Sequence, residues 1–88
     1  MLNLPSTLTQ EVAHQCLEEL RQHVNEPSDK VVVDGTALQR FDTSALAVLL
    51  ELRRECARRG KLFAVQGLPT RLRELAGLYG ISALLPAA

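Results

Sequence analysis

Three polar residues, Asp42, Thr43 and Ser44, stand directly before an apolar run, and their side chains could serve three kinds of chemistry. They could cap a helix, supply a nucleophilic hydroxyl, or accept a phosphate. Capping is expected of at least one of them, because the first backbone N–H groups of a helix have no partner within it. A phosphate on Thr43 or Ser44 would face the positive end of the helix dipole and would be tolerated there.

Nucleophilic catalysis by these hydroxyls finds little support in the rest of the chain. A nucleophile needs a base within hydrogen-bonding reach and a third group that orients the base. The two histidines, His14 and His23, both fall on or near the solvated face of the first expected helix. No G-x-S-x-G, Walker or G-x-G-x-x-G motif occurs, so no nucleotide site is indicated. A small hydrolase using Ser44 is therefore a disfavoured alternative.

The sequence indicates no metal and no cofactor. His14 and His23 lie nine residues apart, and neither has a thiolate or carboxylate at ligand spacing. Cys16 and Cys56 are isolated residues on apolar helix faces. They are interpreted as small buried side chains, in preference to a disulfide, and metal ligation is less favoured still.

Length and composition predict a single domain over residues 1–88, with an aliphatic core, because 47% of the residues are hydrophobic and three are aromatic. Ten basic and ten acidic residues cancel, which gives no support for nucleic-acid binding. The chain shows neither a basic leader nor an apolar stretch of about 18 residues. The sequence therefore predicts a cytoplasmic protein without direct membrane insertion.

Strands and helices that alternate along the chain must position these residues. Apolar and β-branched segments at residues 2–4, 30–34 and 61–65 predict strands, and residues 81–86 predict a final short strand or turn. The KVVVD segment at residues 30–34 is expected to be buried on both faces. The order β-α-β-α-β-α-β predicts an α/β fold in which the central strands are parallel and the helices pack on the sheet.

Helical spacing of apolar residues predicts the three helices. The first is expected to begin at a capping box formed by Thr7 and Gln10. The second should begin at residue 42 or 43 and stop at Gly60, because glycine adopts the left-handed conformation that often ends a helix. The third should span residues 69–79, with a proline in its first turn.

A basic cluster surrounds the end of the second expected helix and consists of Arg53, Arg54, Arg58, Arg59 and Lys61. Glu51 and Glu55 alternate with these residues at helical spacing. The cluster is therefore interpreted as a solvated face whose charges balance. Contact with an acidic protein surface or with lipid headgroups is the weaker alternative.

Several apolar residues lie to one side of the main apolar stripes of the second and third helices. They are Leu46, Leu50, Leu75, Leu78 and Tyr79. A single sheet with three helices cannot hide every apolar face. Their simplest role is in the core, and any of these side chains that stay exposed would form a docking patch.

The segment from residue 31 to residue 86 resembles a STAS domain, the SpoIIAA-like fold of bacterial anti-sigma factor antagonists. The family pattern has a strand that ends in aspartate, a short turn, and Asp-Ser/Thr-x-Gly-Leu opening a helix with Leu-Leu. The matching residues are Asp34, Asp42, Thr43, Ser44, Leu46, Leu49 and Leu50, and Ala45 stands in place of the usual glycine. The resemblance implies that the first strand of the family is missing or shortened here.

Thr43 and the ending LRELAGLYGISALLP are similar to the MlaB-like branch of this family. This resemblance implies a non-enzymatic subunit of the Mla-type phospholipid-transport ABC transporter, which maintains lipid asymmetry of the outer membrane. Such a subunit binds an MlaF-like cytoplasmic ATPase and is peripheral at the inner membrane through its complex. The implied partner-binding residues are Gln39, Arg40, Asp42, Thr43, Ser44, Ala45, Leu46, Leu50 and Tyr79. The alternative is an antagonist whose Thr43 or Ser44 is phosphorylated by an anti-sigma kinase.

Overall fold

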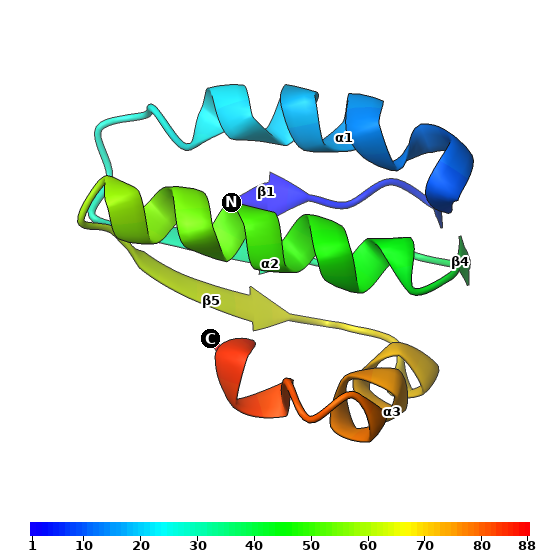
Figure 1. The fold of residues 1–88 in the computed structure, drawn as a ribbon. Coiled ribbons are helices and arrows are strands. Elements are labelled where there is room, and N and C mark those ends of the chain that lie inside the picture. The colour runs from blue at the N-terminus through cyan, green and yellow to red at the C-terminus, as the bar shows by residue number, and fades with distance from the viewer.

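The computed structural model describes residues 1–88 and shows a parallel sheet with helices packed on it (Figure 1). Strands β1 (Leu2–Asn3), β3 (Lys30–Asp34) and β5 (Leu62–Gln66) pair in the order β1-β3-β5. Helix α1 (Gln10–His23) connects the first two of these strands, and helix α2 (Ser44–Arg58) connects β3 to β5. This architecture confirms the predicted α/β class with parallel central strands.

Helices α1 and α2 lie side by side on one face of the sheet, and their amino ends lie at the same end of the molecule (Figure 1). In β3, Val31 and Val33 belong to the core, whereas Val32 is only half-buried. The prediction that this strand is buried on both faces is therefore wrong. Side chains alternate along a strand, so Val32 lies on the face that α1 and α2 leave uncovered.

Helix α2 supplies a large part of the core. Its buried apolar residues are Ala45, Leu46, Val48, Leu49, Leu52 and Cys56. Apolar burial stabilises a fold by roughly 25 cal/mol for each Å² removed from water, so this face holds α2 firmly in place. The amino end of α2, where Asp42, Thr43 and Ser44 lie, is consequently held in place by this packing.

Two strands that the sequence did not predict lie beside the helix starts. Strands β2 (Thr7–Leu8) and β4 (Arg40–Phe41) form a separate parallel pair. Helix α1 begins at Gln10, so Gln10 cannot be its third residue and the predicted capping box of Thr7 with Gln10 is wrong. Thr9 precedes α1 instead, and its side chain makes no capping hydrogen bond.

The carboxyl-terminal region packs along the edge of the sheet that β5 forms. Helix α3 (Thr70–Leu78) begins one residue after Pro69, and residues 82–84 form a short 3₁₀ turn, η1 (Ser82–Leu84). The turn confirms one of the two alternatives for residues 81–86. Directly after it, the N–H of Val65 in β5 donates to the carbonyl oxygen of Pro86 at 2.8 Å. No helix combines the length and apolar character needed to cross a bilayer.

Candidate functional site

Asp42 lies where α1 and α2 begin, and its carboxylate caps both helices. Oδ1 accepts a hydrogen bond from the Ser44 N–H at 2.8 Å, and Oδ2 accepts one from the Gln10 N–H at 3.1 Å. These two bonds, the one from Ser44 first, hold the pKa of Asp42 below its ordinary value. The predicted capping role is thus confirmed for Asp42, and it extends to a second helix.

Thr43 is the residue directly before α2, and its side chain is exposed. The side chain makes no capping hydrogen bond, while the backbone oxygen of Thr43 accepts from the Leu46 N–H at 3.1 Å. Because Asp42 already caps the helix, the hydroxyl of Thr43 is left free for contact with another molecule. Ser44, next to it, is half-buried.

A groove of about 280 Å³ runs between α1 and α2 beside Ser44. Its lining residues are Gln10, Ala13, His14, Leu17, Ser44, Ala47, Val48 and Glu51. Ala13 and Ala47 have short side chains and leave space in the groove, and Leu17 and Val48 give it an apolar lining. An apolar side chain of a partner could therefore enter this groove while its neighbours contact Thr43.

Four further residues implied by the family resemblance divide into two kinds. Gln39 and Arg40 are exposed next to the helix start. Ala45 and Leu46 are buried, at 0% and 4% exposure, and belong to the core. The expectation that Ala45 and Leu46 contact a partner is corrected accordingly, because both side chains are enclosed by the protein itself.

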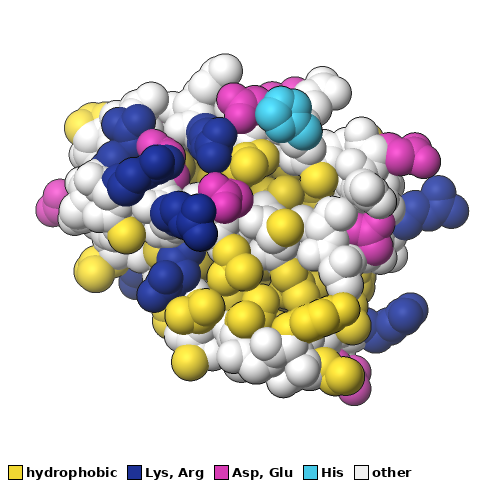
Figure 2. Space-filling view, in the orientation of Figure 1, with side chains coloured by type: hydrophobic (Ala, Val, Ile, Leu, Met, Phe, Trp, Pro, Cys, Tyr) yellow, Lys and Arg dark blue, Asp and Glu magenta, His cyan; other side chains and the backbone are white.

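The expected apolar patch is present in part. Figure 2 shows hydrophobic side chains gathered over the region of β5 and α3 in the orientation of Figure 1. Leu78 and Tyr79 are 81% and 63% exposed, and Leu50 and Leu75 are partly buried against the core. Large apolar side chains this exposed are typical of contact surfaces when they gather on one face.

The groove does not assemble a catalytic set. His14 lines it together with Ser44, but no hydrogen bond joins the two side chains, and none joins His14 to a carboxylate. A nucleophile would need both contacts. No group of three or more His, Cys, Asp or Glu side chains is placed to hold a metal ion. Cys16 and Cys56 are free and buried.

The parallel sheet, with an Asp-Thr-Ser start on its central helix, defines this protein as a STAS-type domain. The fold is similar to that of a sulfate transporter family protein from Wolinella succinogenes, with a TM-score of 0.72 and 19% sequence identity. The match covers 93% of this chain and 67% of that one.

A family model described as "Mlab, STAS domain" matches residues 1–86, so the chain belongs to the MlaB family of STAS domains. A search of curated proteins found no match. The fold and the family that the sequence predicted are therefore both confirmed, whereas the roles of individual residues stay predictions.

Proposed function

We propose that this protein is the non-enzymatic STAS subunit of a phospholipid-transport ABC transporter. It binds the cytoplasmic ATPase and is peripheral at the inner membrane through that complex. Membership of the MlaB family supports this assignment. The observation that carries it is the exposed side chain of Thr43 at the start of a helix that Asp42 holds in place.

Docking would use the amino end of α2 as a preformed contact. Asp42 ties the starts of α1 and α2 together, so the chain around Thr43 loses little conformational freedom on binding. The groove beside Ser44 accepts an apolar side chain, and Leu50 and Tyr79 extend the contact. In this proposal, the domain binds the assembled ATPase more tightly than the unassembled one. Binding therefore shifts the equilibrium toward the assembled ATPase.

Charge introduced at residue 43 tests the proposal. We expect Thr43→Glu to weaken binding to the ATPase by about tenfold or more, because a carboxylate without a partner would be dehydrated in the interface. Co-purification with the ATPase and the ATPase rate of the complex are the measurements. Thr70→Glu is the matched control, because Thr70 is also exposed at a helix start.

If the Thr43→Glu complex assembles and hydrolyses ATP at the normal rate, Thr43 has no part in docking. The second candidate function, an antagonist switched by phosphorylation, rests on the same exposed hydroxyl. Incubation with an anti-sigma kinase and ATP separates the two functions by mass spectrometry. One phosphate per chain on Thr43 or Ser44 would favour the antagonist, and an unmodified chain would favour the transporter subunit.

A further inference from the structure

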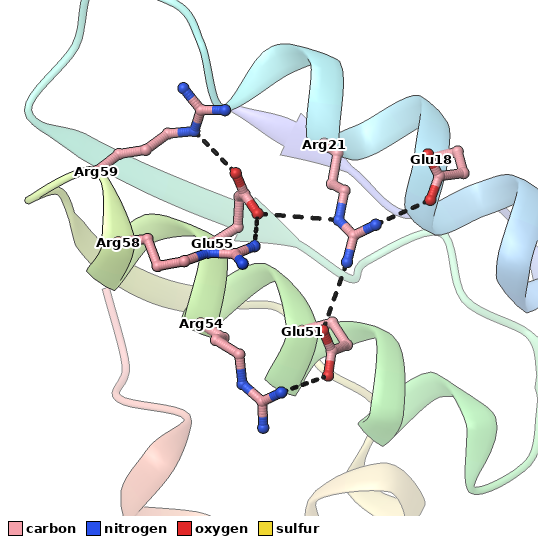
Figure 3. A network of polar contacts seen from close by, with 7 residues as sticks. All are labelled: Glu18, Arg21, Glu51, Arg54, Glu55, Arg58 and Arg59. Carbon is pink, nitrogen blue, oxygen red and sulfur yellow. Dashed lines mark hydrogen bonds and ion pairs between the residues drawn. The ribbon is translucent and has the colours of Figure 1, made fainter.

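Four arginines and three glutamates join α1 to the carboxyl half of α2 (Figure 3). These residues are Glu18, Arg21, Glu51, Arg54, Glu55, Arg58 and Arg59. Glu55 accepts hydrogen bonds from Arg58 and from Nε of Arg59, the latter at 2.9 Å. Glu51 pairs with Arg54 at 3.3 Å and, across the two helices, with Arg21 at 3.4 Å.

Two carboxylates of this network, those of Glu51 and Glu55, lie beneath the arginines of α2. The side chains of Glu55 and Glu51 are 11% and 35% exposed, whereas those of Arg54, Arg58 and Arg59 are 70%, 60% and 43% exposed. The network holds four guanidinium groups against three carboxylates, and its two most exposed charged groups are the guanidinium groups of Arg54 and Arg58. Figure 2 shows the result as basic side chains gathered at one end of the visible face.

The arginines keep hydrogen-bond donors for another molecule. A guanidinium group has five N–H donors, and Arg54 uses only Nη1 for its pair with Glu51. Arg58 contacts Glu55 through Nη2 alone, and Arg53 is exposed and forms no ion pair. Because the buried Glu55 holds Arg58 and Arg59, their side chains have little freedom left to lose when they bind.

We propose that this arginine surface, made of Arg53, Arg54, Arg58 and Arg59, docks an acidic segment of a partner protein. It lies at the opposite end of α2 from Thr43, about 20 Å away by the rise of the helix. Glu55 holds the guanidinium groups of Arg58 and Arg59, and guanidinium groups match carboxylates, which they bind through two parallel hydrogen bonds. The proposal does not depend on which protein contacts Thr43.

A narrow protein segment fits this surface better than an anionic membrane does. Glu18 and Glu26 border the surface, and their side chains are 49% and 64% exposed. Glu18 contacts Arg21 of the network, and the backbone oxygen of Glu26 accepts from Lys61, which follows the end of α2. A flat anionic bilayer over the arginines would meet these carboxylates too, whereas a peptide can pass between them.

Binding of a labelled oligoglutamate peptide, measured by fluorescence anisotropy, tests the proposal. We expect Arg54→Gln combined with Arg58→Gln to weaken binding by about tenfold, because two charge-assisted contacts are lost. Arg71→Gln combined with Arg73→Gln is the matched control: it removes the same charge from exposed residues of α3. Circular dichroism checks that both variants are folded.

Weaker binding by the α2 variant alone, with the control variant unchanged, would establish the site. An equal loss in both variants would overturn the proposal, because only the net charge of the protein would then matter. Vesicles that contain phosphatidylglycerol form the second arm of the experiment. Binding to these vesicles without binding to the peptide would also overturn the proposal and would assign the surface to the membrane.

Discussion

Asp42 accepts hydrogen bonds from the first turns of two helices that are far apart in the sequence. Ser44 lies two residues after Asp42, and a capping bond between them could be predicted from the position of an aspartate before a helix. Gln10 and Asp42 are 32 residues apart in the sequence, so no local sequence pattern predicts the bond between them. The carboxylate therefore joins the two helices as well as capping each of them.

This double role predicts a pH-dependent effect of Asp42→Asn. The folded state lowers the pKa of Asp42, so its contribution to stability is present above the unfolded pKa, about 3.9. That contribution is lost as the pH falls through the lower folded-state pKa. We therefore expect Asp42→Asn to lower the Tm by several degrees at pH 7, and we expect the difference from the unsubstituted protein to shrink toward pH 3.

Thermal unfolding followed by circular dichroism between pH 3 and pH 7 measures this difference. Asp29→Asn is the control, because Asp29 is exposed and its side chain makes no hydrogen bond. A difference in Tm between Asp42→Asn and the unsubstituted protein that stays constant with pH would contradict the double role. The carboxylate charge would then contribute nothing to the two caps.

At the scale of the element, α2 shows how far sequence patterns reach. Apolar spacing predicted the helix and its core face, and Gly60, which has a φ of 69°, ends it as expected. The pattern did not show that the carboxylates of Glu51 and Glu55 lie beneath the arginines. Sequence spacing gives neighbours along a helix, but exposure depends on α1, which packs beside it.

The apolar face of α2 makes a second prediction. Leu49 is fully buried, so Leu49→Ala should lower the free energy of unfolding by roughly 2–5 kcal/mol through lost burial and the cavity left behind. Leu78→Ala removes the same atoms from a side chain that is 81% exposed, and it should change the free energy by less than about 0.5 kcal/mol. Urea unfolding of both variants measures the two changes.

A similar loss in both leucine variants would contradict the core assigned to α2. If the losses differ as expected, Leu78→Ala has a further use. It leaves the fold intact, so any weaker binding to the ATPase can be assigned to the exposed apolar patch and not to unfolding.

At the scale of the whole molecule, some features depend on contacts between segments that are far apart in the sequence. Strands β2 and β4 were missed because each has only two residues, and each becomes a strand only by pairing with the other. Apolar spacing predicted a helix that begins at residue 42 or 43, and the fold leaves Thr43 exposed at its start. The family resemblance implied a partner contact for Ala45 and Leu46, whereas the packing of α2 against the sheet encloses both side chains.

The ends of β3 and β5 meet at a joint beside Gly67, the residue that directly follows β5. There the N–H of Gly35 donates to the carbonyl oxygen of Gln66 at 2.9 Å, and Asp34 accepts from the N–H of Thr36 at 2.8 Å. Gly67 has a φ of 67°, and a Cβ atom on it would collide with the side chain of Thr36. The joint thus requires glycine for conformation and for space.

Two glycine variants separate these two requirements. Gly60→Ala, at a φ of 69° with no atom within 4 Å of an added Cβ, should cost about 1 kcal/mol of unfolding free energy from backbone strain alone. Gly67→Ala should cost roughly 2–4 kcal/mol, because the collision with Thr36 adds to the same strain. Urea unfolding of the two variants gives the difference. Equal costs would mean that Thr36 moves aside freely, and the joint between β3 and β5 would then be looser than its hydrogen bonds indicate.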